Sequence, residues 1–181
     1  AFIISSGQHD EGVTEQLIDI LLGQNIEVHE AKSAFKAGDI VYDAGTRVVF
    51  LAQPKYGMIM NMLGRTDYPD NQLTRSGSGA LMSYDVLAQA YPEIMSVNVI
   101  PAKSRFNGDF AKISSSSRFI PEIGTYAGYV LSGRENSSYH TVNLLLKAGL
   151  KVYRLNDRPH KDFYVEADAG AINEILAEAP T

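Results

Sequence analysis

The sequence predicts an α/β fold of the flavodoxin-like type, a three-layer sandwich with a mainly parallel sheet and small β-hairpin additions. Short apolar runs alternate with segments whose apolar residues recur at helical spacing, and Gly-containing loops join them. Parallel neighbours in a sheet need a crossover connection, which is usually a helix. Alternating strands and helices therefore favour a sheet that helices cover on both faces.

The first strand–helix–strand unit begins at the first residues. Phe2 to Ser5 is a short apolar run, typical of a buried strand. One face of the following helix consists of residues at helical spacing: Val13, Leu17, Ile20 and Leu21. The run 23–25 (Gly-Gln-Asn) ends this helix, and Ile26 to His29 alternates like a second strand.

The same order of elements returns late in the chain. A strand is expected over Tyr129 to Ser132, a helical face over Tyr139 to Leu146 and a second strand over Leu150 to Tyr153. Leu21-Leu22 of the first unit aligns with Leu145-Leu146 of the second. Duplication predicts this similarity, and chance with shared packing constraints predicts it about as well.

Each unit is followed by a smaller β element. A hairpin is expected from Ile40–Tyr42 and Arg47–Leu51, with its turn at 43–45 (Asp-Ala-Gly). In the second unit, Phe163–Val165 leads into a last helix. The apolar face of this helix consists of Ile172, Ile175, Leu176 and Ala179.

The segment between the units begins with a helix that Pro54 opens and that carries Tyr56, Ile59, Met60 and Leu63 on one face. A polar loop is expected over 66–79. A short helix with Leu87, Ala90 and Tyr91 is expected to end near Pro92. After it, Val97 to Ile100 is expected to form a central strand.

Composition limits the class of protein. The 181 residues suit one domain, so residues 1–181 are expected to form a single α/β accessory domain, excised from a larger multidomain protein because the first strand starts without a leader. A net charge of −5 without a basic run argues against nucleic acid or an anionic membrane as partner. No apolar stretch approaches the length of a membrane span, and the lack of Cys excludes disulfides, thiolate nucleophiles and Cys-based metal sites.

Signatures of catalysis are missing from the sequence. The four histidines, His9, His29, His140 and His160, have no Glu or His at the spacing of a zinc site. The near match to a nucleophile elbow, Ser76 to Gly79, lies in the polar loop rather than at a strand-to-helix turn. No phosphate-binding glycine loop follows a strand. We therefore assign no catalytic residue, no metal ligand and no cofactor to this chain.

The loops after the first strand of each unit are the best candidates for a ligand site. In open α/β sheets the carboxyl ends of strands are where ligands usually bind. The candidate ligand-binding residues there are Gln8, His9, Asp10, Arg134, Glu135, Asn136 and Tyr139. The competing interpretation, which we favour, is that Asp10, Asn136 and Ser137 cap the helices and the others are solvated.

The methionine-rich helix allows two interpretations as well. Tyr56, Met58, Met60 and Met62 could line an adaptable apolar groove. Their helical spacing favours core packing, or an interface with a neighbouring domain, over a groove.

Four stretches of the chain carry a resemblance to a known family: Phe2–Glu30, Ala44–Asp70, Tyr84–Val86 and Gly128–Arg154, with the short elements 52–54 (Ala-Gln-Pro) and 68–70 (Tyr-Pro-Asp). They resemble the region downstream of the catalytic domain in large bacterial zinc carboxypeptidase-like proteins. The resemblance implies a C-terminal domain similar to the class I glutamine amidotransferase fold. The family's zinc-binding His-x-x-Glu and its catalytic Glu belong to the upstream domain, and the amidotransferase nucleophile is a Cys, which this chain lacks.

The resemblance therefore implies a noncatalytic accessory domain of a periplasmic or secreted zinc carboxypeptidase-like protein. Its partner would be the upstream peptidase domain of the same chain, on which it packs or for which it helps to position substrate. Zinc would be bound only in that upstream domain. The alternative is a ligand-binding module that takes a peptide terminus or a glycan in the cleft at the strand ends, since Arg134 beside a helix start favours an anionic group.

Overall fold

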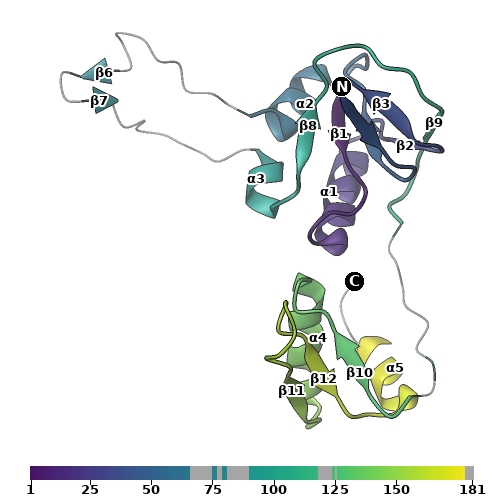
Figure 1. Cartoon of the computed structure of the whole chain (residues 1–181), viewed down its shortest axis with the longest axis vertical. Coiled ribbons are helices and arrows are strands. Elements are labelled where there is room, and N and C mark those ends of the chain that lie inside the picture. The colour runs from purple at the N-terminus through teal and green to yellow at the C-terminus, as the bar shows by residue number, and fades with distance from the viewer. Residues whose placement is uncertain (66–74, 77–78, 81–89, 118–123, 125, 178–181) are drawn as a thin grey trace. The chain divides into compact units, whose positions relative to one another are not determined.

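The computed structural model describes residues 1–65, 75–76, 79–80, 90–117, 124 and 126–177 (Figure 1). Contacts divide the chain into two compact units, whereas the sequence predicts a single domain over residues 1–181. The first unit contains Ala1–Gln8 and Leu17–Ser115, and the second contains His9–Gln16 and Ser116–Thr181. Helix α1 (Glu11–Gly23) contributes residues to both groups.

The first unit is built on a five-stranded sheet in the order β8-β1-β5-β2-β9. All neighbouring strands in it run antiparallel. The strands are β1 (Phe2–Ile4), β2 (His29–Ala31), β5 (Arg47–Val49), β8 (Val99–Pro101) and β9 (Phe110–Lys112).

The predicted flavodoxin-like sandwich with a mainly parallel sheet is wrong, because the described strands pair only antiparallel. Strand β5 lies between β1 and β2, and its Val48 is opposite both Ile3 and His29. Since β1 and β2 are each antiparallel to β5, they point the same way, as the crossover through α1 requires. The unit is thus a split βαβ motif, in which a later strand separates the two that the helix joins.

The second unit repeats this motif. Its sheet has the order β10-β12-β11, with β10 (Tyr129–Leu131), β11 (Val152–Arg154) and β12 (Phe163–Val165), all antiparallel. Helix α4 (Asn136–Lys147) joins β10 to β11, and α5 (Ala169–Ala177) follows β12. The first unit has the corresponding order β1, α1, β2, β5 and α2 (Tyr56–Leu63), with a hairpin inserted before β5.

The helix ends of the two motifs match in detail. Asn25 and Gly149 follow α1 and α4 and have φ values of 56° and 83°. The N–H of the next residue reaches back to the helix in both units, from Ile26 to the Leu21 carbonyl and from Leu150 to the Leu145 carbonyl, each at 3.0 Å. This is the left-handed cap that ends many helices, so the match is expected from duplication and also from common capping chemistry.

Both faces of the first unit's sheet are buried. Ile3 and Val48 belong to a cluster that Phe35 and Tyr42 cover, with Phe50, Phe106 and Phe110 packed against it. The alternate residues Phe2, Ile4 and Val49 are buried as well, as are Leu17, Ile18 and Leu21 of α1. A strand that is buried on both faces has a continuous apolar sequence, as strands of parallel sheets do. This explains why the sequence of β1 has the pattern of a parallel strand although β1 pairs antiparallel.

The predicted hairpin between Ile40–Tyr42 and Arg47–Leu51 is also wrong in its pairing. Strand β4 (Ile40–Tyr42) pairs with β3 (Phe35–Ala37), and β5 enters the central sheet instead. The turn between β3 and β4 contains Gly38, whose φ of 63° suits a tight two-residue loop. The strand expected to be central at Val97 to Ile100 corresponds to β8, which lies at the edge of the sheet.

Helix α2 confirms the helix predicted after Pro54. Its buried residues are Ile59, Met62 and Leu63, whereas Tyr56 and Met60 are exposed. Helix α3 (Tyr91–Met95) has Pro92 in its first turn, so this proline opens a helix rather than ending one as predicted.

The expectations for Leu87, for Ala179 and for most of the polar loop 66–79 with its Ser76 to Gly79 motif lie outside the described residues. From that loop the structure describes the short strand β6 (Arg75–Ser76) and the first residue of β7 (Gly79–Ala80). Within the described parts of the chain, no helix has both the length and the apolar character needed to cross a membrane.

Candidate functional site

Gln8 holds two segments of the first unit together. Its side chain is 7% exposed and lies in the loop after β1. Its Nε2 donates to the carbonyl and hydroxyl oxygens of Ser5, at 3.1 and 3.2 Å, and to the carbonyl of Asn98 at 3.0 Å. Its Oε1 accepts from the Asn98 N–H at 2.9 Å. These bonds use the polar atoms of the amide, so Gln8 connects the loop to the segment before β8.

Asp10 connects the starts of two helices within the second unit. It immediately precedes α1, and its Oδ1 accepts from the Val13 N–H at 3.0 Å, as an N-cap residue does. Its Oδ2 accepts from the N–H of Asn136, the first residue of α4, at 2.8 Å. Glu135, at the N-cap position of α4, makes no side-chain cap bond. The carboxylate that complements the start of α4 is therefore that of Asp10.

Arg134 and Tyr139, two other predicted residues, bond to backbone carbonyls of the same unit. Arg134 donates from Nη2 to the His9 carbonyl at 3.0 Å, and the Tyr139 hydroxyl donates to the Gly133 carbonyl at 3.1 Å. The His9 ring meets the His160 ring edge-on, with 6.4 Å between centroids. The second unit thus brings together six of the seven predicted site residues, while Gln8 belongs to the first unit.

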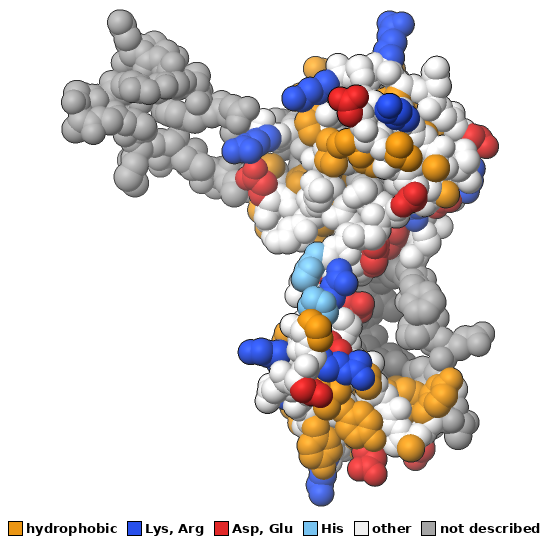
Figure 2. All heavy atoms as spheres, in the orientation of Figure 1, with side chains coloured by type: hydrophobic (Ala, Val, Ile, Leu, Met, Phe, Trp, Pro, Cys, Tyr) orange, Lys and Arg blue, Asp and Glu red, His pale blue; other side chains and the backbone are white. Residues whose placement is uncertain are grey.

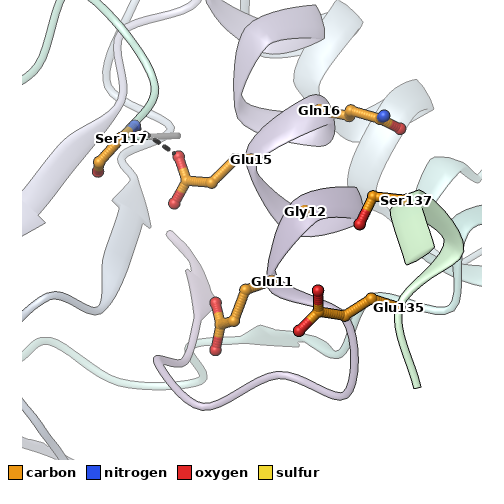
Figure 3. Close-up of a pocket in the computed structure, with 7 residues that line it drawn as sticks. All are labelled: Glu11, Gly12, Glu15, Gln16, Ser117, Glu135 and Ser137. Atoms are coloured by element: carbon orange, nitrogen blue, oxygen red, sulfur yellow. Dashed lines mark hydrogen bonds between the residues drawn. The ribbon is translucent and has the colours of Figure 1, made fainter. Parts of the chain in front are cut away.

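A pocket of about 530 Å³ lies next to these residues in the second unit (Figure 3). It is lined by Glu11, Gly12, Glu15, Gln16, Ser117, Glu135 and Ser137. Figure 3 shows Glu15 reaching from α1 toward Ser117, whose N–H donates to Glu15 Oε2 at 2.9 Å. Of the lining residues, only Glu135 is among the predicted ones. Glu11 and Glu15 are four residues apart on one helix, a spacing that places them on the same face and was readable in the sequence.

The pocket is lined by three carboxylates, those of Glu11, Glu15 and Glu135. Their negative charge favours ammonium groups and hydroxyl donors and disfavours carboxylates. Among the described residues, no group of three or more His, Asp or Glu side chains is placed to hold a metal ion. The lining side chains offer carboxylate, amide and hydroxyl groups for polar recognition.

Sequence reasoning missed an ion pair in the first unit between a buried arginine and a partly exposed glutamate. Arg47 Nη1 lies 2.7 Å from Glu30 Oε2, and Arg47 also donates to the Gly45 carbonyl at 2.6 Å. The hydrogen bond from Lys32 lowers the pKa of Glu30, and the charge of Arg47 lowers it further, against the opposing effect of burial. Burial raises the pKa of Tyr42 in the same unit.

The second unit has a different interaction at the equivalent place. Arg154 and Phe163 are cross-strand partners, as Glu30 and Arg47 are in the first unit. The Arg154 guanidinium lies 4.4 Å from the centre of the Phe163 ring and 5.7 Å from that of Tyr139. A cation–π contact thus takes the position that an ion pair has in the first unit.

The fold and the site define an antiparallel α/β protein of two split βαβ units, in which the polar residues after β1 and β10 bind the chain's own backbone. Neither family models, nor curated proteins, nor solved structures gave a match to this chain.

Proposed function

We propose that this chain is a noncatalytic accessory domain of a periplasmic or secreted zinc carboxypeptidase-like protein. In this role it packs on an upstream peptidase domain or helps that domain to position its substrate. The zinc and the catalytic glutamate belong to the upstream domain. The proposal rests on the residue resemblance and on the site, and not on the amidotransferase-like fold, which the antiparallel sheets contradict.

The observation that carries the proposal is how the candidate polar groups are used. The side-chain amide of Gln8 forms hydrogen bonds with Ser5 and Asn98. Both carboxylate oxygens of Asp10 accept hydrogen bonds from backbone N–H groups at the starts of α1 and α4. A catalytic or ligand-binding group needs an atom that can reach a substrate. Groups that are bonded to their own backbone instead stabilise the loops that they come from.

A carboxypeptidase assay on the purified chain tests the noncatalytic role. Blocked dipeptides are incubated with the chain, with added Zn²⁺ in one arm and with a chelator in the other. We expect no release of the C-terminal amino acid in either arm. Release that the chelator abolishes would contradict the proposal.

The accessory role needs a second measurement. The upstream peptidase domain is expressed with and without this chain attached. We expect the attached form to have a higher melting temperature or a higher kcat/KM for peptides. Equal values for both forms would overturn the accessory role even if the chain alone is inactive.

A second candidate is the ligand-binding module, and the acidic pocket favours it for one class of ligand. A peptide carboxylate would be repelled by Glu11, Glu15 and Glu135, whereas a glycan hydroxyl or a peptide amino terminus would be attracted. A thermal-shift panel of sugars and amines would test it, with Glu135→Gln as the site variant and Glu174→Gln, on α5, as its control. Without a shift in the native chain, or with an equal shift in the Glu135→Gln variant, this candidate fails.

A further inference from the structure

The sequence contains one Asn-Gly pair, Asn107-Gly108, and it lies in the connection between β8 and β9 of the first unit. Both residues are exposed, and the connection around them is neither helix nor strand. Figure 1 shows the connection passing over the upper end of this unit, and Figure 2 shows Lys and Arg side chains on the surface there. Water therefore reaches the pair.

The two groups that react when an asparagine loses its amide are not held by the fold. Within the parts of the chain that the structure describes, neither the Asn107 side chain nor the Gly108 N–H makes a hydrogen bond. The next residue differs, because the Asp109 carbonyl accepts from the Lys32 N–H at 2.9 Å. Glycine also has no side chain that would hinder the approach of its nitrogen to the Asn107 carboxamide.

Other asparagines lack one of these features. Three of them lie inside helices, where the N–H of the next residue bonds to the preceding turn: Asn61, Asn143 and Asn173. Asn156 is exposed in a loop, but the residue after it is Asp157, whose side chain hinders the attack of its nitrogen. Exposure, a free N–H and a following glycine thus come together at Asn107.

The reaction open to this pair is an intramolecular substitution. Hydroxide takes the proton of the Gly108 amide, and the nitrogen attacks the side-chain carbonyl carbon of Asn107. A new C–N bond closes a five-membered succinimide, and the bond to Nδ2 breaks, so that this nitrogen leaves as ammonia with a proton from water. Water then opens the ring at either carbonyl. One opening gives aspartate, and the other gives isoaspartate, whose main chain is one carbon longer.

The longer main chain would disturb the core beneath the connection. A Cβ on Gly108 would lie 2.6 Å from Phe110 Cζ and 3.1 Å from Phe35 Cβ, so the Gly108 backbone lies directly against these two residues. The Phe110 ring is confined, because it packs against the rings of Phe35, Phe50 and Phe106 with 5.0, 5.4 and 5.8 Å between centroids. An extra main-chain atom before Gly108 moves this backbone, whereas aspartate leaves it unchanged.

We propose that Asn107 is a site of spontaneous deamidation, and that its isoaspartyl form loosens the aromatic cluster packed over Ile3 and Val48 of the first unit's sheet. The modification needs only water. It adds a carboxylate to a chain that already has a net charge of −5, and it makes the stability of the first unit fall with the age of the molecule.

Ageing of the purified whole chain tests the site. The chain is kept at about pH 8 or about pH 6 and digested with trypsin, and the peptide 106–112 is followed by mass spectrometry. We expect this peptide to gain the mass difference between an amide and an acid, faster at the higher pH, and to separate into two products on chromatography. Asn107→Gln should abolish the change, because its longer side chain does not form the five-membered ring. The peptide that contains Asn156 is the internal control and should change far more slowly.

Melting temperatures test the consequence for the cluster. The acidic fraction of the aged native chain, separated by ion exchange, should melt about 4–8 °C below the fresh chain. Fresh Asn107→Asp has the same added charge with an unchanged main chain, so it should melt with the fresh native chain, as should aged Asn107→Gln. A peptide 106–112 that changes no faster than the Asn156 peptide overturns the site. An acidic fraction that melts like Asn107→Asp overturns the effect on the cluster.

Discussion

The carboxylate of Asp10 accepts a hydrogen bond from the backbone N–H of Asn136 at 2.8 Å, so a residue at the start of α1 caps the start of α4. Its other oxygen caps its own helix at Val13. One side chain therefore satisfies helix-terminal donors from two parts of the sequence.

Replacing Asp10 should lower stability. Asp10→Ala removes both caps and should reduce the free energy of unfolding by about 1–2 kcal/mol, while Asp10→Asn should cost less because an amide oxygen still caps a helix. Urea unfolding followed by circular dichroism measures both. Asp157→Ala, at an exposed loop position, is the control and should change little. Equal effects of Asp10→Ala and Asp157→Ala would show that the caps do not matter.

Gln8→Ala should lower the free energy of unfolding by more than the loss of the buried side chain alone would. The substitution leaves the N–H and carbonyl of Asn98 and the carbonyl of Ser5 without their partner in a partly buried place. We expect a loss of about 2–3 kcal/mol in the free energy of unfolding. Gln53→Ala serves as a comparison for the free energy of unfolding, because Gln53 forms a similar set of hydrogen bonds with the backbone of Glu27 and Phe50 in the first unit. If Gln8→Ala leaves stability unchanged, Gln8 has another role.

The ion pairs of Glu30 with Lys32 and with Arg47 make stability depend on pH. Because the pKa of Glu30 is lowered from 4.5 in the folded chain, its contribution is fully present above that value. The contribution is lost as pH falls through the folded pKa. Glu30→Gln should therefore cost about 2 kcal/mol near neutral pH and progressively less in acid.

Chemical unfolding from pH 7 down to pH 3 follows this difference between the native chain and Glu30→Gln. The control is Glu27→Gln, whose pKa is also lowered, by its hydrogen bond to Lys112, but whose carboxylate is in solvent. We expect no measurable change for it, since exposed pairs contribute little. A pH-independent cost of Glu30→Gln would mean that its size or packing matters rather than its charge.

Arg154 and Phe163 should be energetically coupled. Arg154→Met keeps most of the apolar stem and removes the cation, and Phe163→Leu removes the ring. A double-mutant cycle on the free energy of unfolding should give about 0.5–1 kcal/mol of coupling, the range of an exposed cation–π contact. Additive effects of the two substitutions would contradict this contact.

Local pattern located most elements but could not say which strands pair. The helical faces of α1 and α4 and the strands β1, β10 and β12 lie where periodicity predicts them. The insertion of β5 between β1 and β2 depends on contacts between residues far apart in sequence, such as Val48 with Ile3, and no local signal encodes it. The two-residue loop at Gly38-Asp39 was a readable hairpin signal that competed with the later turn at Gly45.

The candidate site was predictable to a similar degree. The capping interpretation anticipated Asp10, because an Asp directly before an amphipathic helix is a common N-cap. Asn136 and Ser137 instead lie within the first turn of α4. The partner of Gln8 could not be foreseen, since Asn98 approaches it only through the pairing of β8 with β1.

Chemical rescue of Asp10→Ala tests most directly the claim that the chain's own carboxylate fills the anion position at the start of α4. Melting temperatures are measured for the native chain and for this variant in sodium acetate and in sodium chloride of equal ionic strength. Acetate should raise the melting temperature of Asp10→Ala by about 1–2 °C and leave the native chain unchanged. The claim would be contradicted if acetate or a peptide carboxylate stabilised the native chain and the Arg134→Ala substitution abolished that stabilisation.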